Sequence, residues 1–542
     1  MGNIEPENLG ERLRANEVPT PRQRAEVLII LEDAENEMFW CDLTIARLKA
    51  HVVALQKRKD VLSTHMEQSR SLLAPIRTLP DEILNIIFQI DVQIAGGSTL
   101  YANGNDHSIR PNILGGVCIH WRRVTLSNPA LWVILDVTLA DVRRTSSLDL
   151  ILDRSCTQES PLPLEITIAA DDTMTVAEEN PILRTMLSHC NRWCKATLKI
   201  PHHLLNFPIF SVVHGNIGRL EFLSLVWDYR TQRIGYPVVP GVWSMFETAP
   251  QLKTIEVLAP GSRYALPWMQ AITVRCLVQW GTPADIREDL EFCRHAQTLY
   301  LHISMALPSG EDLDSPLVLD CDTLELDLFE LAYNNDPASF SVFLQARVFT
   351  CPNLHSLEVA NFIPHSTDDD CAFPLDPLID FCIPLGGSLR SLSIHDTVFT
   401  TNMTVVPILT ELPLLETLTV EEFSLYHNPP ERRYLLHQSV LEDLKASRTD
   451  PENQSKLPTI IPRLKTLIFG VVAPSQHFSI PAFIRLLESR WLPDGELDGV
   501  VSLENVTLRW GGGEAVVNEL KPLKLAGQNI TVHSSLSRHV LL

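Results

Sequence analysis

The chain has 542 residues, of which 45% are hydrophobic and 20% are charged. This length exceeds what one hydrophobic core usually organises, and the composition is that of a folded globular chain, so we expect several domains or a repeat array rather than a disordered protein. The formal net charge of −22 lacks the cationic surface that phosphate binding requires, which disfavours nucleic acid and anionic membranes as partners.

The cysteines and the N-terminal residues predict a compartment. The chain has 11 cysteines, an odd number that is scattered along the sequence, which favours a reducing environment. The first residues are polar and charged, and no run of about 18 apolar residues exists, so neither a signal peptide nor a membrane span is expected. We therefore expect a cytoplasmic or nuclear protein.

The first predicted element is a long helix. Residues 1–24 are polar and interrupted by prolines, which predicts a disordered tail, whereas residues 22–74 contain no proline or glycine. Apolar residues there recur at alternating spacings of four and three, so we predict a coiled-coil helix over residues 25–74, ended by Pro75. The seam reads Val27, Leu31, Ala34, Met38, Cys41, Ile45, Leu48, Val52, Leu55, Lys59, Leu62, Met66, Ser69 and Leu73.

A single amphipathic helix of this length cannot bury its own apolar stripe and needs a second helix. That helix comes from another copy of the chain, from a different protein or from a fold-back onto the chain's own body, and the sequence leaves the three open. Ala34, Cys41, Lys59 and Ser69 weaken the seam. Self-association through residues 25–73 is therefore a prediction that the pattern permits without requiring it.

Residues 75–132 form the next predicted unit. Pro80, Asp81 and Glu82 suit the first turn of a helix, and Ile83, Leu84, Ile87 and Phe88 follow on what we interpret as one apolar face. A loop rich in glycine and asparagine comes next, followed by an apolar run over residues 117–124, a turn at 127–129 and the start of a strand within 130–139.

Residues 133–542 carry a recurring phrase, a turn residue followed by L-x-x-L-x-(L/I/V). Clear copies cover residues 217–227, 249–259, 321–330, 351–361, 387–396, 412–422 and 461–471, and weaker copies cover 194–201 and 503–510. Alternating apolar residues predict short strands with one buried face, and a repeat of about 30 residues is typical of a solenoid. We predict an irregular leucine-rich-repeat solenoid in a chain of the α+β or α/β class, and another α/β packing of the same strands stays open.

Motifs that carry chemistry are missing from the sequence. We find no phosphate cradle, dinucleotide-binding loop, zinc-protease motif or nucleophile elbow, so we expect no enzyme and no cofactor. His189, Cys190 and Cys194 lie near the pair His202–His203, but their spacing is not typical of zinc ligands, and no metal site is predicted. The acidic run at 368–370 is interpreted as a solvated loop.

The order of residues in the segment 75–132 resembles the F-box. It reads Pro75-Ile76, Leu79-Pro80-Asp81-Glu82-Ile83-Leu84 and Ile87-Phe88, then Val117-Cys118 and Trp121-Arg122, then Pro129 and Leu131-Trp132. With the helix before it and the repeats after it, the chain is similar to F-box proteins of mushroom-forming fungi that have an N-terminal coiled coil and a C-terminal leucine-rich region.

This resemblance implies the substrate receptor of an SCF-type ubiquitin ligase. The F-box would dock on the adaptor subunit, which bridges to a cullin, and the repeats would hold a target protein that the sequence does not identify. The implied adaptor-binding residues are Leu79, Pro80, Ile83, Leu84, Ile87, Phe88, Val117, Cys118 and Trp121. The alternative is a coiled-coil and repeat scaffold for protein–protein interaction without a ligase role. The polar stretch 90–113 departs from a compact F-box, and we predict that it is a flexible insert.

Overall fold

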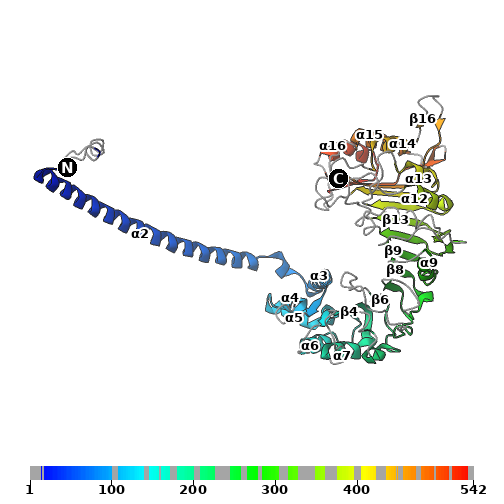
Figure 1. The fold of residues 1–542 in the computed structure, drawn as a ribbon, viewed down its shortest axis with the longest axis horizontal. Helices are drawn as coiled ribbons and strands as arrows, with labels where there is room; N and C mark the ends of the chain where they lie inside the picture. Colours follow the sequence, from blue (N-terminus) through cyan, green and yellow to red (C-terminus); the bar gives the residue numbers. More distant parts are fainter. Residues whose placement is uncertain are drawn as a thin grey trace. The chain divides into compact units, whose positions relative to one another are not determined.

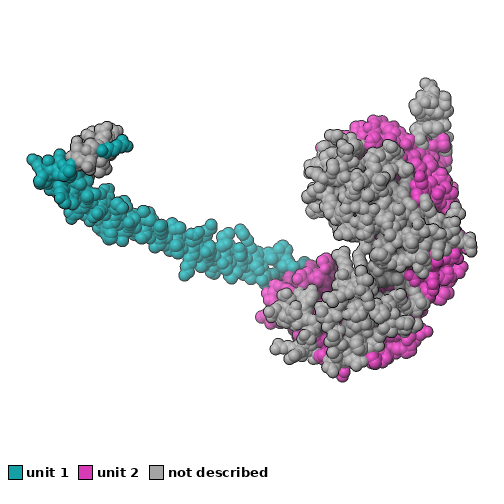
Figure 2. Space-filling model, in the orientation of Figure 1, with its two compact units in different colours: residues 1–86 teal, residues 87–542 magenta. Residues whose placement is uncertain are grey.

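We describe the fold from a computed structural model of the chain (Figure 1). It describes residues 14, 18–100, 108–139, 146–157, 160–170, 180–200, 205, 208–225, 244–257, 265–278, 283–303, 315–327, 348–360, 375–395, 404–422, 435–446, 448–449, 456–471, 478–492, 496–497, 499–511 and 515–534. The chain divides into two compact units, residues 1–86 and 87–542, which Figure 2 distinguishes by colour.

The first unit is dominated by helix α2, Pro21–Leu72. The hydroxyl of Thr20 accepts a hydrogen bond from the Gln23 N–H at 3.4 Å, and the Gln23 side chain accepts one from the Thr20 N–H at 3.1 Å, so a capping box fixes the helix start. The helix ends before Pro75, which begins the 3₁₀ turn η1, Pro75–Thr78. The predicted long helix is confirmed, with a start four residues earlier than residue 25 because this capping box lies inside the segment assigned to the tail. No residue of α2 is buried, and its pairing stays a prediction.

Helix α3, Asp81–Ile94, spans the boundary between the two units. The other helices of the described chain are α4 Arg110–Gly115, α5 Ile119–Ser127, α6 Ser146–Arg154, α7 Pro181–Ser188, α9 Pro283–Glu291, α12 Leu375–Cys382, α13 Val406–Thr410, α14 Gln438–Asp443, α15 Ile480–Arg490 and α16 Ala515–Leu525. The 3₁₀ turns are η2 Pro129–Trp132, η4 Cys190–Arg192, η5 Pro208–Val213, η7 Trp268–Gln270 and η9 Ile383–Leu385.

The second unit is built on one large sheet, which has 16 strands among the described residues. Its strands are β1 Ser98–Leu100, β2 Ser108–Ile109, β3 Ile134–Leu139, β4 Leu164–Ala170, β5 Trp193–Lys199, β6 Phe222–Leu225, β7 Thr254–Val257, β8 Thr273–Val278, β9 Thr298–Ile303, β11 Thr323–Asp327, β13 Ser356–Ala360, β14 Ser391–His395, β15 Thr417–Glu422, β18 Thr466–Val471, β21 Asn505–Trp510 and β22 Ile530–Ser534. From β1 to β22 each of these strands pairs in parallel with the next one in chain order, except that β2 pairs antiparallel with β1 at the edge. Three small pairs stand apart, formed by β10 Leu317–Val318 with β12 Phe349–Thr350, β16 Arg448–Thr449 with β17 Lys456–Leu457, and β19 Glu496–Leu497 with β20 Val500–Val501.

The recurring leucine phrase corresponds to these strands. Every copy, strong or weak, contains a strand of the large sheet, from β5 in residues 194–201 to β21 in residues 503–510. The strand expected within 130–139 is β3. The structure adds β4, β8, β9 and β22, which the phrase did not mark. The coarse fold class is thereby confirmed as mixed helix and strand, with a long N-terminal helix and a large parallel sheet.

One face of the sheet is the hydrophobic core. Apolar residues occupy the same register position in successive strands, and each is at most 3% exposed, so a continuous buried row runs along the sheet. This row is Leu135, Ile166, Ala196, Leu223, Ile255, Val274, Leu299, Leu324, Leu357, Leu392, Leu418, Leu467, Val506 and Ile530. Helices cover this face, as the rings of Phe469 on β18 and Phe483 on α15 illustrate with centroids 5.8 Å apart.

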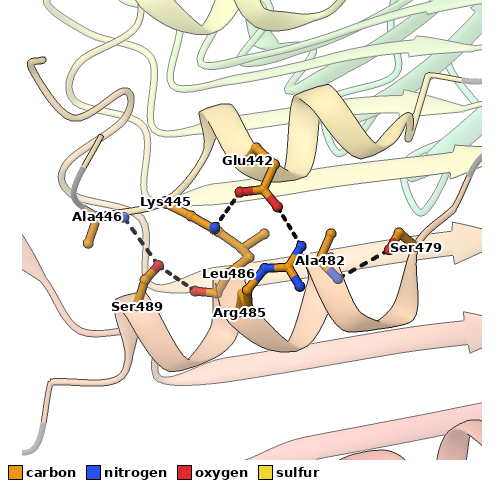
Figure 3. Close-up of polar contacts among 8 residues, drawn as sticks. All are labelled: Glu442, Lys445, Ala446, Ser479, Ala482, Arg485, Leu486 and Ser489. Carbon is orange, nitrogen blue, oxygen red and sulfur yellow. Dashed lines mark hydrogen bonds and ion pairs between the residues drawn. The ribbon is translucent and has the colours of Figure 1, made fainter. Parts of the chain in front are cut away.

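Neighbouring helices on the covered face are joined by polar contacts, of which α14 and α15 give an example (Figure 3). The carboxylate of Glu442 accepts hydrogen bonds from Lys445 and from Arg485, the latter at 2.7 Å. The Ser489 hydroxyl accepts from the Ala446 N–H at 3.3 Å and donates to the Leu486 carbonyl at 2.7 Å. These contacts hold α14 beside α15.

A buried arginine strengthens the same region. Arg490 is completely buried, and its guanidinium donates to the backbone carbonyls of Leu444, Ile460 and Ile461 at 2.5, 2.6 and 3.1 Å. Burial lowers the pKa of Arg490 to about 10. Ile461 has a φ of 47°, a region that β-branched residues rarely adopt, and the bond from Arg490 to its carbonyl helps to hold it there.

Candidate functional site

Helix α3 is the centre of the predicted docking segment, and it presents two different apolar faces. The first turn begins at Pro80, whose carbonyl accepts from the Leu84 N–H at 3.1 Å. Leu84, Phe88 and Val92 fall at i, i+4 and i+8 and are at most 1% exposed, so this face belongs to the core.

The second face of α3 consists of isoleucines that remain exposed within the chain. Its members, which we call the isoleucine face, are Ile83, Ile86, Ile87, Ile90 and Ile94, with exposed fractions of 43, 53, 37, 51 and 83%. Branching at Cβ lowers helix propensity, so isoleucine at these positions does not stabilise the helix through its intrinsic propensity. A contiguous exposed apolar stripe of this kind is typical of a protein interaction surface.

The predicted site residues therefore separate into two groups. Ile83 and Ile87 are available at the surface, whereas Leu84 and Phe88 are buried and act first as core residues. The single apolar face interpreted from the sequence was two faces, because the four residues span almost half of the helix circumference. Sequence reasoning missed Ile86, Ile90 and Ile94, although their spacing continues the stripe that Ile83 and Ile87 begin. Leu79 is half-buried and Pro80 is exposed.

Helix α5, which follows α4, packs against α3 through aromatic rings. The half-buried ring of Trp121 lies against that of Phe88, with centroids 4.8 Å apart. The thiol of Cys118 caps α5 by accepting from the Trp121 N–H at 3.5 Å. Val117, just before the cap, is 58% exposed. Trp121 and Cys118 thus organise the unit, and Val117 is the member of this group that a partner reaches most easily.

The stretch 90–113 was predicted to be a flexible insert, and the structure differs over most of it. Helix α3 continues to Ile94, and a turn through Gly96 and Gly97 leads into β1, which is buried and pairs in parallel with β3. Gly97 has a φ of 79°, and a side chain there would meet the carbonyl oxygen of Ile134 at 2.4 Å. The chain returns at α4, and residues 101–107 lie outside the described residues.

An ion pair holds this stretch in place. The guanidinium of Arg110 donates two hydrogen bonds to the carboxylate of Asp91, both at 2.7 Å. The hydrogen bond from Arg110 lowers the pKa of Asp91. A bidentate pair fixes direction as well as distance, so it anchors the start of α4 to α3. Sequence spacing could not reveal this, since the two residues come from separate elements.

The face of the large sheet opposite the buried row is a second candidate site. Its side chains alternate with the buried row, and the middle strands contribute a charged and aromatic group that we call the polar cluster. The polar cluster consists of Arg275, Tyr300, His302, Glu325, Asp327, Glu358, His395, Glu421 and Arg509, from strands β8, β9, β11, β13, β14, β15 and β21. Sequence analysis left the target-binding positions unidentified, and the leucine phrase did not mark β8 and β9, which carry Arg275, Tyr300 and His302.

Interactions within the polar cluster connect strands that are distant in the sequence. His395 lies 3.6 Å from Glu358 and 3.5 Å from Glu421, and Arg509 donates to the same Glu421 carboxylate. The Arg275 guanidinium stands 4.5 Å from the centre of the Tyr300 ring. The polar cluster is therefore a preorganised network that also leaves aromatic and charged groups for a partner.

Two carboxylates of the polar cluster, Glu325 and Glu421, have shifted pKa values. Burial, and after it the charge of Glu358, raises the pKa of Glu325. Burial also acts to raise the pKa of Glu421, but hydrogen bonds and charge from His395 and Arg509 outweigh it and hold that pKa below its ordinary value. Carboxylates with raised and with lowered pKa values thus lie on the same face of the sheet.

Three of the residues considered as metal ligands, His189, Cys190 and Cys194, make other contacts. The thiols of Cys190 and Cys194 donate to the carbonyls of Val212 and Leu164 at 3.8 and 3.2 Å, and His189 lies 3.0 Å from the Thr185 carbonyl. Among the described residues no group of three or more histidine, cysteine, aspartate or glutamate side chains is arranged to hold a metal ion. His202–His203 and the acidic run 368–370 lie outside the described residues.

Comparison with known proteins adds no assignment. No protein-family model matches the sequence, and no curated protein matches it. In the part of the chain that is described, no helix has the length and the apolar character needed to cross a bilayer. The chemistry of the isoleucine face and of the polar cluster is thus the basis for inferring function.

Proposed function

We propose that this chain is the substrate-recognition adaptor of an SCF-type ubiquitin ligase. In this proposal residues 75–132 are an F-box that docks on the adaptor subunit and, through it, on a cullin. The sheet that follows is an irregular leucine-rich-repeat solenoid, and its face opposite the buried row binds the target. The observation that carries the proposal is the isoleucine face of α3, which lies within the segment whose residue order resembles the F-box.

The isoleucine face has the character that such docking needs. Protein interfaces gain most of their free energy from apolar side chains that become fully buried at the centre of the contact. Burying one isoleucine side chain contributes about 1.5–3 kcal/mol relative to leaving it in water. Several exposed isoleucines on one rigid helix thus offer a partner a sizeable gain with little ordering cost.

The polar cluster supports the second half of the proposal. The exposed residues of parallel strands form a regular grid, and here the grid carries Arg275, Tyr300 and carboxylates. Arginine and tyrosine are the residue types most enriched among those that dominate protein–protein binding. The net charge of −22 favours a target with basic segments.

The proposed role in the reaction is approximation. The chain would hold a lysine-bearing target close to a ubiquitin thioester carried by another subunit, which raises the effective concentration of the lysine amine at the thioester carbonyl. None of this chain's side chains needs to contact the reacting atoms.

Co-purification of the full-length chain tests the proposal. We expect the adaptor subunit and the cullin to accompany the unsubstituted chain, and an Ile83→Glu/Ile90→Glu variant to lose at least about tenfold of that recovery, because two charges would be buried in an apolar contact. Ile272→Glu is the matched control, since Ile272 is 42% exposed and Ile83 is 43% exposed. The double variant and the control variant change only surface positions, so we expect both to fold.

The alternative is a scaffold that oligomerises through α2 and binds partners through the sheet without a ligase. If the adaptor subunit and the cullin are absent from complexes of the unsubstituted chain, the ligase proposal is wrong and the scaffold remains.

A further inference from the structure

Helix α2 has a pronounced charge asymmetry along its length. Residues 26–46 contain six acidic and no basic residues, whereas residues 47–72 contain six basic and two acidic residues. The helix is continuous over both halves, and none of its residues is buried. Two copies laid side by side in opposite directions would place each acidic half against a basic half.

We propose that α2 pairs with α2 of a second copy of this chain as an antiparallel two-stranded coiled coil. In antiparallel coiled coils each a position faces a d position of the partner helix. The a positions of the seam are Leu31, Met38, Ile45, Val52, Lys59 and Met66, and the d positions are Val27, Ala34, Cys41, Leu48, Leu55 and Leu62. The charges select one register among those that preserve this pairing.

In that register the core layers are almost entirely apolar. They are Val27 with Met66, Leu31 with Leu62, Ala34 with Lys59, Met38 with Leu55, Cys41 with Val52, and Ile45 with Leu48, each occurring twice by symmetry. The one charged core residue, Lys59, faces the smallest residue of the seam, Ala34. This leaves room for the lysine stem to extend towards Glu35, which follows Ala34.

The flanking positions complement one another in the same register. Glu37 faces Arg58 across one side of the seam, and Asp42 faces Lys49 across the other. Symmetry repeats each pair, so four attractive contacts and no like-charge contacts border the core. Residues at these flanking positions set partner choice and orientation in coiled coils.

The competing arrangements lack this agreement. In a parallel, in-register pair Glu37 would face Asp42 of the partner, and Lys59 would face Lys59 within the core. Shifting the antiparallel pair by one heptad towards the C-terminus brings Lys49 beside Lys49 and places Lys59 opposite Cys41. Like charges at close range oppose both alternatives.

The pairing has a functional consequence that does not depend on the ligase proposal. The paired segment, residues 27–66, is about 60 Å long at 1.5 Å per residue. The C-terminal ends of the two α2 helices, where each chain continues into its α3, then lie at opposite ends of the rod. The dimer is therefore a bivalent molecule with two separated sets of binding surfaces, which favours targets that carry more than one recognition site.

Thiol crosslinking of the full-length chain tests orientation and register. In a Val52→Cys variant treated with a short bismaleimide, we expect a linked dimer whose digest contains residue 41 of one copy joined to residue 52 of the other. A Cys41→Ser/Val52→Cys variant is the control and should lose that peptide. A Cys41–Cys41 product would show parallel pairing, and a link from α2 to its own chain's residues 87–542 would show a fold-back. Either result overturns the proposal.

Charge exchange tests the contacts that select the register. Light scattering should give the unsubstituted chain twice the monomer mass of 60.9 kDa. Glu37→Arg/Asp42→Lys should weaken dimerisation about tenfold or more, because four attractive contacts become repulsive. Adding Lys49→Glu/Arg58→Glu should restore it, whereas in a parallel pair the two introduced cations would still face each other. The proposal is overturned if the unsubstituted chain is a monomer, or if the variant with all four substitutions does not regain dimerisation.

Discussion

Glu422, the last residue of β15, shows how a single half-buried group makes the fold sensitive to pH. Burial raises the pKa of this carboxyl to about 7 from an ordinary value of 4.5, although the Leu436 N–H donates to it at 2.6 Å. Between these two values the folded chain holds a proton that the unfolded chain has lost. Folding stability contributed by this group therefore falls as pH rises from 4.5 to about 7 and is fully lost above that.

Glu422→Gln should remove this dependence while keeping an acceptor for the Leu436 N–H. We expect the variant to equal the unsubstituted chain near pH 4 and to exceed it at pH 8 by a few kcal/mol at most, since one pKa unit corresponds to about 1.4 kcal/mol. Urea unfolding at several pH values measures the difference.

Glu416→Gln provides a control, because the contribution of Glu416 to folding stability depends on pH with the opposite sign. The hydrogen bond from Lys465 lowers the pKa of Glu416, so its stabilising contribution is present above pH 4.5 and disappears as pH falls. Equal pH profiles for the two variants would contradict the raised pKa of Glu422.

At the scale of the element, α3 combines a core face and a surface face on one helix. Phe88 is 1% exposed and contacts Trp121, whereas Ile90, two residues further on, is 51% exposed. The two faces thus separate the core of the unit from the surface that we propose for docking.

Alanine substitutions should separate these roles. Phe88→Ala should cost about 3–5 kcal/mol of unfolding free energy, because it removes a buried ring and leaves a cavity. Ile90→Ala should change stability by less than about 0.5 kcal/mol, since a surface position is altered and alanine is the better helix former. Chemical denaturation of both variants measures this, and similar losses would mean that the isoleucine face is part of the core.

At the scale of the molecule, the two candidate surfaces lie on separate parts of the fold. The isoleucine face belongs to α3, and the polar cluster belongs to strands from β8 to β21. If the isoleucine face binds the ligase and the polar cluster binds the target, a substitution in one surface should weaken its own binding and leave binding at the other surface unchanged.

An Arg275→Glu/Tyr300→Ala variant should lose labelled targets in proximity labelling with the proteasome blocked, while its recovery of the adaptor subunit stays unchanged. The physical reason is that this change removes both members of the cation–π pair and reverses one charge in the polar cluster. Arg294→Glu serves as the control, because Arg294 follows α9 rather than lying on a strand. An unchanged set of targets in the double variant would locate target binding elsewhere.

Much of the secondary structure was predictable because apolar spacing decides which side of an element can be buried. The alternation in the leucine phrase identified strands such as β13, β14 and β15. Strands β8 and β9 were missed because buried alanines, Ala271 and Ala296, stand where the other copies have the leading leucine. The leucine phrase has leucine at its first position, whereas the fold requires there only a small or apolar residue that packs at the turn.

Periodicity along the chain was enough to predict the long helix and the recurring strands, whereas the resemblance of residues 75–132 to the F-box stays a prediction. Only the packed chain shows that Leu84 and Phe88 are core while Ile83 and Ile87 face solvent, and that Asp91 and Arg110 order the stretch after α3. The polar cluster, in which His395 meets Glu358 and Glu421, likewise comes from packing. Those contacts depend on which strands pair and in what register, and spacing along the sequence carries no record of either.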